Sequence, residues 1–213
     1  MRAKLLKPTL ESRVVLLTDG VKRQAVAHLA NVDRVMARLI TAHGACRIGA
    51  KKRDPFEILA TSIISQQLSV KAADTIEKRV RALMSSFEPA TLLSTSHDLL
   101  RSAGLSNGKA RYLHALATHI VDGKLDFVAL KKCHDEHVIE ALTEVPGIGR
   151  WTAEMFLMFG LRRADVLATG DVALQRAVRN LYGERKTLDQ VGKKWRPYAS
   201  VASWYLWRSL ENN

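Results

Sequence analysis

Hydrophobic residues recur at helical spacing along most of the chain. Between about residues 21 and 43 they fall three and four positions apart, as they would on one face of a helix. Residues 58–67 form a mainly apolar stretch that we expect to be buried. Convincing period-2 alternation and hairpin dipeptides are absent. The pattern therefore predicts an all-α fold with roughly ten helices, many of them short.

Capping residues mark where several of these helices begin. Asp54, Pro55 and Glu57 supply an N-cap, a first helical residue and an acidic third residue, the order that opens a helix. Thr187 and Gln190 have the spacing of a capping box. We expect helices over residues 21–43, 58–67, 69–84, 95–102, 108–121, 135–143, 150–159, 171–182 and 197–210, with a short helix beginning at Pro89.

The charge of the chain points to a polyanionic partner. Its 213 residues include 33 Lys and Arg against 21 Asp and Glu, which gives a formal net charge of +12. Contacts between cationic side chains and nucleic-acid phosphates release condensed counterions, and this release favours binding. No apolar run approaches the roughly 20 residues that span a bilayer, so no membrane partner is expected. A high isoelectric point without functional meaning is the alternative at this stage.

The two cysteines, Cys46 and Cys133, limit the cofactors that the chain can hold. An iron–sulfur cluster takes four thiolates, as does a zinc site built from cysteines alone, and a disulfide framework is poorly supported. His134 and His137 follow Cys133, but their spacing matches no zinc motif. We expect a soluble protein of a reducing intracellular compartment, the cytoplasm in a prokaryote or the nucleus in a eukaryote.

The sharpest local signal is the segment 145–149, Val-Pro-Gly-Ile-Gly, between two predicted helices. Gly147 and Gly149 allow positive φ and a close backbone approach, while Ile148 can plug the turn into the core. The amides of the turn and of the next helix would then point outward and form an anion site. An ordinary αα-hairpin with a glycine at a helix end is the alternative.

Five segments, taken in order, resemble the helix–hairpin–helix (HhH-GPD) superfamily of DNA glycosylases, and most closely its 3-methyladenine DNA glycosylase II type. The segments are residues 63–70 (Ile-Ile-Ser-Gln-Gln-Leu-Ser-Val), 104–106 with 109–110, 142–153, 166–172 and 195–207. The resemblance implies one HhH-GPD unit over residues 1–213, with the motif at about 135–160 and no separate N-terminal β domain. It also implies two helical subdomains with a cleft for DNA and the base between them.

Hydrolysis of an N-glycosidic bond builds positive charge on the sugar, and a nearby carboxylate can stabilise that charge and activate water. Asp171 follows Gly170 at a predicted helix start, where an N-cap is the ordinary role of an aspartate. The resemblance assigns the catalytic carboxylate to Asp171, and the two roles are compatible. Asp165 is the nearest rival, and we expect it to be a structural or capping residue.

Trp151 follows the hairpin at a position where the resembled enzymes that also nick the DNA backbone carry a Schiff-base lysine. Its identity therefore implies a glycosylase without lyase activity. The resemblance also places Trp151 in the base pocket, where an aromatic face attracts a cationic base, although core packing is the alternative. Trp204 and Tyr198, from the aromatic C-terminal segment, are expected to line the same pocket.

An enzyme that excises a base must flip the nucleotide out of the duplex, and a side chain then fills the gap. By resemblance the intercalating residue is Gln67 or Leu68, and a polar loop with Leu68 buried is the alternative. The resemblance also implies a monovalent cation, Na or K, on backbone carbonyls of Val145 and Ile148, with no other cofactor required. Phosphate contacts are expected from the hairpin and from the 104–109 segment, although that segment also fits a plain loop. The residues expected to make these contacts are Gly147, Gly149, Thr152, Gly104, Ser106 and Lys109.

These features predict a monofunctional, monomeric DNA glycosylase of base excision repair. It would act on double-stranded DNA and release alkylated bases of the 3-methyladenine and 7-methylguanine type. One alternative is a non-catalytic helix–hairpin–helix DNA-binding protein, which needs the hairpin and the charge but not Asp171. The other is a glycosylase for deaminated, oxidised or mismatched bases. Trp151 disfavours the lyase enzymes of this kind and the cysteine count disfavours the iron–sulfur enzymes, but neither argues against the remaining monofunctional ones.

Overall fold

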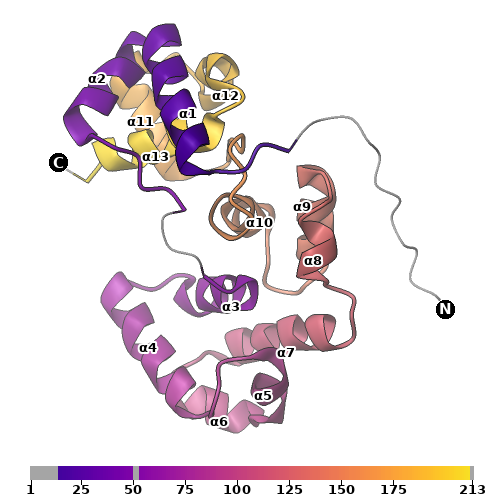
Figure 1. Cartoon of the computed structure of the whole chain (residues 1–213). Coiled ribbons are helices and arrows are strands. Elements are labelled where there is room, and N and C mark those ends of the chain that lie inside the picture. The colour runs from indigo at the N-terminus through magenta and orange to yellow at the C-terminus, as the bar shows by residue number, and fades with distance from the viewer. Residues whose placement is uncertain (1–13, 50–52, 212–213) are drawn as a thin grey trace. The chain divides into compact units, whose positions relative to one another are not determined.

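The computed structural model describes residues 14–49 and 53–211. These residues form thirteen α-helices, one π-helix and one 3-10 helix (Figure 1). Over the same residues, β pairing is limited to one isolated antiparallel bridge between Leu16 and Arg163. The predicted all-α fold is confirmed. No helix in this described part is long and apolar enough to cross a membrane.

The chain divides into two compact units. Of the described residues, the first unit contains 53–156 and the second contains 14–49 and 157–211. The helices of the first unit are α3 (Pro55–Ser65), α4 (Val70–Ala82), α5 (Pro89–Ser94), α6 (His97–Ser102), α7 (Asn107–Val121), α8 (Phe127–Leu130), α9 (Asp135–Thr143) and α10 (Arg150–Met155). The predicted cleft between two subdomains stays a prediction.

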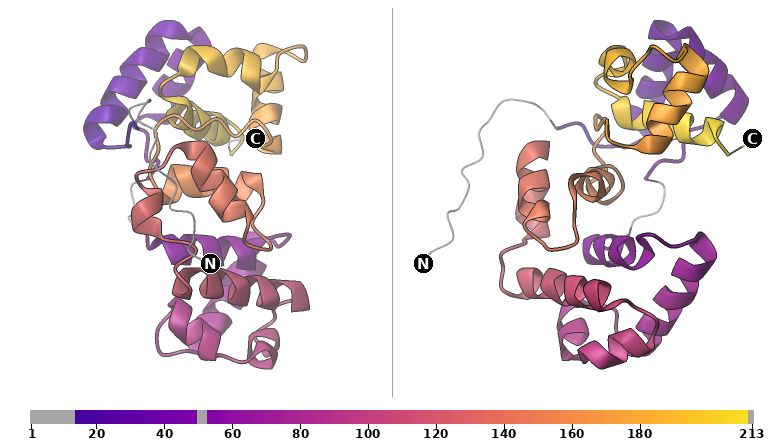
Figure 2. Two further views of the ribbon diagram at one scale, coloured as in Figure 1. Left: turned by 90° about the vertical axis from the view of Figure 1, so that its right-hand side faces the viewer. Right: turned by 180° about the vertical axis from the view of Figure 1, so that it is seen from behind.

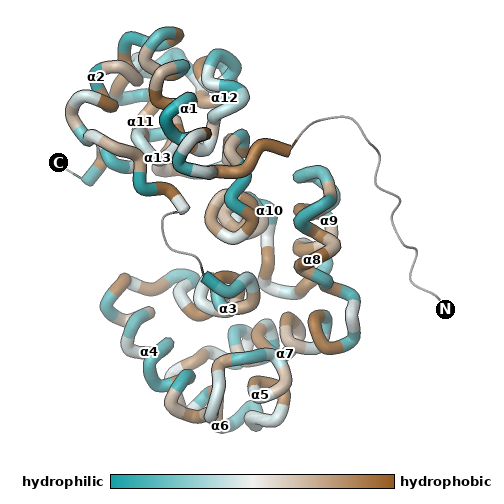
Figure 3. The backbone as a smooth tube through the Cα atoms, viewed as in Figure 1, coloured by the Kyte–Doolittle hydropathy of each residue, from teal (hydrophilic) through white to brown (hydrophobic). Residues whose placement is uncertain are grey.

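In the first unit, α7 packs against three other helices. Helices α3, α5 and α6 pack against it, α4 packs against α3, and α10 packs against α9 (Figure 1 and Figure 2). Hydrophobic and hydrophilic positions are mixed along most of these helices, as Figure 3 shows, because each helix buries only one side. The fully buried side chains of this unit include Leu59, Ile63, Ile64, Leu113, Leu116, Val138 and Leu142.

In the second unit, α13 (Ala199–Ser209) packs against three helices: α1 (Asp19–Val32), α2 (Arg34–His43) and α11 (Val172–Tyr182). Helix α12 (Leu188–Gly192) continues into the 3-10 helix η2 (Lys193–Trp195) and packs on α11. The capping box predicted for Thr187 and Gln190 is present at the start of α12. Trp195 and Tyr205 are fully buried, which confirms that part of the aromatic C-terminal segment is core.

The helix predicted over residues 21–43 is in fact two helices, α1 and α2, separated at Asp33. The Asp33 carboxylate caps α2 by accepting from the amides of Val35 and Met36 at 2.9 and 3.4 Å. Its other oxygen accepts from Tyr182 Oη at 2.7 Å and from Trp195 Nε1 at 2.8 Å. The apolar spacing continues through Asp33, so the hydrophobic pattern does not show the break between the two helices. The break is evident only from the contacts of Asp33 with Tyr182 and Trp195, which are distant in sequence.

The helix predicted over residues 150–159 is also interrupted. Helix α10 ends at Met155, and the π-helix η1 (Phe156–Gly160) follows it directly. A π-turn inserts one residue into the helical register and is frequent near functional sites. Here it sets the direction of Phe159, whose ring stacks on Trp207 with centroids 6.0 Å apart. Helix α8 has no counterpart among the predicted helices.

Candidate functional site

The hairpin predicted between residues 145 and 149 joins α9 to α10. Val145 and Ile148 are buried, so Ile148 plugs the turn into the first unit as predicted. The Ile148 amide donates to the Val145 carbonyl at 3.0 Å, which closes the turn. Gly147 has φ +89° and needs glycine, whereas Gly149 has φ −92°. The expectation that both glycines provide positive φ is therefore wrong for Gly149.

Gly147 is also required by a close approach to α7. A β-carbon at Gly147 would overlap the ring of Tyr112, while one at Gly149 would meet nothing within 4 Å. The predicted close approach of the hairpin is thus made to an aromatic ring rather than to another backbone. Tyr112 was not identified from the sequence, because an aromatic residue in a helix gives no sign of what it packs against.

Helix α10 begins at the hairpin with Gly149 as its N-cap, and no side chain caps it. Arg150 extends from its first turn to Glu136 on α9, with nitrogen–oxygen distances of 2.6 and 3.0 Å, and also pairs with the buried Glu154. The Thr152 side chain is buried, so its predicted phosphate contact would have to come from its backbone amide. Only the exposed Arg150–Glu136 pair links α10 to α9, because Glu154 lies on the same helix as Arg150.

The loop between α3 and α4 exposes both predicted wedge residues. Gln67 is exposed and has a left-handed backbone with φ +56°, and Leu68 is 38% exposed. The alternative in which Leu68 is buried is therefore wrong. The preceding Gln66 is half-buried, and its side-chain amide donates to the Gly147 carbonyl at 2.8 Å. Whether Gln67 or Leu68 intercalates stays a prediction.

The loop predicted at residues 104–109 leads into α7. Gly104 has φ +107°, and Ser106 caps α7 by accepting from the Lys109 amide at 3.3 Å. The Lys109 ammonium donates to the carbonyls of Ile64 and Gln66 at 2.8 and 2.6 Å, and burial lowers the pKa of this lysine. Phosphate contacts by Gly104, Ser106 and Lys109 stay predictions, because two of the three Lys109 donors already have partners.

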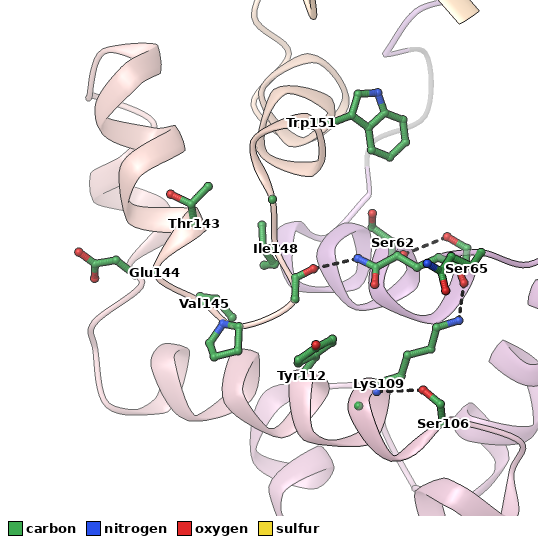
Figure 4. A pocket seen from close by; sticks show the side chains of 16 residues that line it. Ser62, Ser65, Ser106, Lys109, Tyr112, Thr143, Glu144, Val145, Ile148 and Trp151 are labelled. Carbon is green, nitrogen blue, oxygen red and sulfur yellow. Dashed lines mark hydrogen bonds between the residues drawn. The ribbon is translucent and has the colours of Figure 1, made fainter. Parts of the chain in front are cut away.

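These elements surround one hollow in the first unit, with a volume of about 900 Å³. The end of α3, the start of α7 and the hairpin each contribute residues to its wall (Figure 4). Trp151, which is 48% exposed, also lines it, so the alternative of simple core packing is wrong for this residue. Of the two predicted wedge residues, Gln67 lines this hollow, together with the hairpin and with Ser106 and Lys109.

The hairpin is chemically suited to the cation that the resemblance implies. Carbonyl oxygens are typical ligands of hard cations, and the Val145 carbonyl keeps a second lone pair beside the one that accepts from Ile148. No group of three or more His, Cys, Asp or Glu side chains able to hold a metal occurs in residues 14–49 and 53–211. A cation at the hairpin carbonyls stays a prediction.

Asp171 lies in the second unit as the N-cap of α11, and only 5% of its surface is exposed. Its Oδ1 accepts from the Leu174 amide at 2.8 Å, so the capping role foreseen from the sequence is confirmed. The turn before it is closed by the Asp171 amide, which donates to the Ala168 carbonyl at 3.0 Å. The carboxylate is therefore held in one orientation at the start of α11.

An aromatic pair stands beside this carboxylate. Trp207 Nε1 donates to Asp171 Oδ1 over 3.5 Å, and the Trp207 ring stacks on Phe159 of η1 at an interplanar angle of 29°. Neither Trp207 nor Phe159 was singled out from the sequence. Trp207 was one of several aromatic residues in its segment, and the π-turn that directs Phe159 leaves no mark on apolar periodicity.

The two aromatic residues predicted for the base pocket have other neighbours. Trp204 meets the ring of Tyr205 edge-on with centroids 4.9 Å apart, and the Arg208 guanidinium lies over it. Tyr198 contacts His28 of α1, with centroids 5.4 Å apart. Pocket roles for Trp204 and Tyr198 stay predictions, whereas Trp207 makes the contact with Asp171.

Asp165 has the structural role expected of it. Its Oδ1 accepts from the Ala199 amide at the start of α13 at 3.2 Å, and Oδ2 pairs with Arg196 at 2.9 Å. Both carboxylate oxygens are therefore engaged in holding the loop before Asp171 against α13. Asp165 therefore holds the backbone and Arg196 with its two oxygens, whereas the Oδ1 of Asp171 caps α11 and accepts from Trp207.

Comparison with known proteins agrees with these features. Residues 60–197 match the HhH-GPD superfamily of base excision DNA repair proteins. A crystal structure of a DNA-3-methyladenine glycosidase from Bacillus halodurans is 39% identical and has a TM-score of 0.78, with 93% of this chain and 92% of that chain covered. The Schizosaccharomyces pombe 3-methyladenine DNA glycosylase in complex with abasic DNA is 30% identical, also at a TM-score of 0.78, over 88% and 97% of the two chains.

A curated relative, DNA-3-methyladenine glycosylase 1 of Schizosaccharomyces pombe, is 29% identical over 94% of this chain and 92% of its own length. The matched region runs from α3 to the residues just before α13. It therefore includes the hairpin, Asp171 and the wedge loop, which is the loop between α3 and α4 that carries Gln67 and Leu68. The resemblance inferred from five sequence segments is confirmed: this chain belongs to the HhH-GPD superfamily of base excision DNA repair proteins.

Proposed function

We propose that this protein is a monofunctional DNA glycosylase of base excision repair that hydrolyses the N-glycosidic bond of alkylated bases in double-stranded DNA. The observation that carries the proposal is the buried, oriented carboxylate of Asp171 beside Trp207, in a chain of this superfamily. The relatives named above, which are called 3-methyladenine glycosylases, support the choice of alkylated bases as substrates.

Asp171 supplies the negative charge that the reaction needs. As the bond between C1′ and the base nitrogen breaks, its electron pair leaves with the base and positive charge builds on the sugar. An ionised carboxylate facing the sugar lowers the energy of that state. It also accepts a proton from the water whose oxygen bonds to C1′, so that the products are the free base and an abasic site. The donors at Leu174 and Trp207 keep the carboxylate in place during this step.

Alkylated purines explain why one carboxylate suffices. A base such as 3-methyladenine or 7-methylguanine is cationic in the nucleotide and leaves as a neutral molecule, so it needs no strong general acid. The exposed face of Trp151 is the surface on which such a cationic ring would stack. Because Trp151 has no amine, the nucleophile for Schiff-base chemistry is missing at this position, and the product is an intact abasic site.

The hollow in the first unit supports binding to the DNA backbone. Its wall contains the uncapped start of α10 and the turn at Gly147, where backbone amides can hold a phosphate. The pair Gln67 and Leu68, on the loop at the end of α3, is exposed, and one of the two would enter the duplex. A cation on the carbonyls of Val145 and Ile148 would add positive charge where the phosphate sits. No further cofactor is required by this chemistry.

The test is to measure which bases the purified protein releases. Duplex DNA treated with a methylating agent is compared with duplexes that contain uracil or 8-oxoguanine, and the released bases are separated by chromatography. We expect release of 3-methyladenine and 7-methylguanine from the methylated DNA. Release from only the uracil or 8-oxoguanine duplex would make the protein a glycosylase for other lesions. DNA binding without release from any substrate would favour the non-catalytic alternative.

A further inference from the structure

The end of α3 is completed by a lysine from another helix. Helix α3 ends at Ser65, and Gln66 has φ −49° and ψ 131°, so the last carbonyls have no amide partner within the helix. Lys109 of α7 donates through Nζ to the carbonyls of Ile64 at 2.8 Å and Gln66 at 2.6 Å. A cation at the C-terminal end of a helix also interacts favourably with the helix dipole.

The same contacts hold the backbone around Gln67. A left-handed conformation is unfavourable for a residue with a β-carbon, so Gln67 needs its neighbours to maintain it. The carbonyl just before Gln67 is bound by Lys109, and the amide just after it, that of Leu68, donates to the Ser65 carbonyl at 3.2 Å. The exposed Gln67 side chain is therefore presented from a backbone that is fixed on both sides.

Gln66 connects this loop to the hairpin. Its main-chain carbonyl accepts from Lys109, and its side-chain amide donates to the Gly147 carbonyl at 2.8 Å (Figure 4). Gly147 in turn lies against the ring of Tyr112, one helical turn after Lys109 on α7. Lys109 and Gln66 thus join three elements: helix α7, the wedge loop and the turn at Gly147, which is suited to phosphate.

We infer that Lys109 is a positioning residue for base extrusion. By binding the two carbonyls at the end of α3, it fixes the loop that carries Gln67 and Leu68. Through Gln66, it also fixes that loop relative to the Gly147 turn, so the intercalating side chain and the grip on the backbone act as one rigid body. This role rests on the proposed function and differs from a direct phosphate contact.

The surroundings of the ammonium favour positioning over phosphate binding. The Lys109 side chain is half-buried, and its two bound partners are neutral carbonyls rather than carboxylates. Burial lowers the pKa of Lys109, as expected for an ammonium that has lost water without gaining a negative neighbour. A lysine that served mainly to attract phosphate would remain solvated until DNA arrived.

The first experiment compares two duplexes that each contain a single 7-methylguanine. In one the lesion is paired with cytosine, and in the other it lies in a single-nucleotide bulge, where no base pair has to be broken. For Lys109→Met we expect the single-turnover excision rate to fall about ten- to hundredfold on the paired lesion and less than about threefold on the bulge. Lys78→Met, which removes an exposed lysine of α4, is the matched control and should change neither rate.

The salt dependence of DNA binding separates the two roles of Lys109. Loss of a phosphate contact would reduce the slope of log affinity against log salt by about one, whereas loss of a positioning residue leaves the slope unchanged. A reduced slope, or equal losses of rate on the paired and bulged lesions, would overturn the inference. An unchanged rate on the paired lesion would do so as well.

Gln66→Leu provides an independent test, because it breaks the link to Gly147 without touching the lysine. The double variant combines Lys109→Met with Gln66→Leu. If both residues act through one rigid body, its excision rate on the paired lesion should be little lower than that of the more severe single variant. Additive losses would contradict the inference. A wild-type protein that releases base from neither duplex would instead contradict the proposed function, so the two failures are distinguishable.

Discussion

Trp207 and Asp171 meet through the indole Nε1 and the carboxylate Oδ1, 3.5 Å apart, and the same oxygen accepts the Leu174 amide at 2.8 Å. The first contact comes from α13 and the second from α11, so two helices orient one carboxylate. Stacking of Trp207 on Phe159 fixes the indole in turn. The chain therefore combines a common helix cap with an aromatic neighbour that helps to orient the carboxylate.

Trp207→Phe removes the indole donor but keeps an aromatic ring beside Phe159. We expect the single-turnover rate of base release to fall about three- to tenfold, because one long hydrogen bond to the carboxylate is worth on the order of 1 kcal/mol. Affinity for undamaged duplex DNA should not change. A variant with the wild-type rate would show that the indole donor has no part in orienting Asp171.

Gly147 and Gly149 offer a matched pair of substitutions in the hairpin. Gly147→Ala places a β-carbon on the Tyr112 ring at φ +89°, and we expect it to reduce the free energy of unfolding by about 2–4 kcal/mol. Gly149→Ala has open space and a negative φ, so it should change the stability by less than about 0.5 kcal/mol. Thermal denaturation of both variants gives the comparison, and equal effects would contradict the structural account of the turn.

Local signals were sufficient for most of the helices. The starts at Asp54 and Thr187 were predicted correctly because a cap and its partners lie within a few residues of each other. The break at Asp33 was missed because the side chains that bind its second oxygen, Tyr182 and Trp195, lie 149 and 162 positions away. Such contacts leave no periodic trace in the chain.

The candidate site also contains both residues that the sequence singled out and residues that it did not. Gly147 was identified from the local chemistry of a turn, and Asp171 was identified locally only as a helix cap. Its catalytic assignment came from the resemblance to the HhH-GPD superfamily. The partners that orient them, Trp207 and Tyr112, come from other helices and were not singled out. Lys109 was selected as a phosphate ligand, but sequence spacing could not show that its ammonium reaches the end of α3.

Asp33 makes the second unit sensitive to acid. Burial alone would raise the pKa of its carboxyl, but hydrogen bonds from Trp195, Tyr182 and Lys194 outweigh burial and hold the pKa below its usual value. A lowered pKa contributes stability above the unfolded value of about 3.9, and this contribution is lost as the pH falls through the folded pKa. The protein should therefore lose stability below about pH 4.

Asp33→Asn tests this contribution. The variant should be less stable than the wild type by roughly 2–3 kcal/mol at neutral pH, because three donors lose a charged acceptor. The difference should narrow as the pH falls below about 4, where the wild-type carboxylate becomes protonated. Unfolding followed by tryptophan fluorescence measures both quantities, and a difference that stays constant with pH would contradict the role of the ionised form.

The identity of Trp151 predicts a clean separation of glycosylase from lyase chemistry. Incubation with duplex DNA that contains an abasic site, in the presence of borohydride, should give no covalent protein–DNA adduct, because no lysine amine stands at this position. The strand should also remain intact until alkali is added. An adduct seen on a denaturing gel would show that another amine of the protein forms a Schiff base.

The most direct test of the central claim compares Asp171→Asn with Asp165→Asn in the release of 3-methyladenine and 7-methylguanine from methylated duplex DNA. Asparagine keeps the oxygen that caps α11 but removes the charge, so Asp171→Asn should bind DNA like the wild type and lose at least about a hundredfold in rate. Asp165→Asn, which alters a carboxylate held by Arg196 and Ala199, should retain base release within a few-fold of the wild type. Equal release by Asp171→Asn and the wild type would contradict the assignment of the catalytic carboxylate.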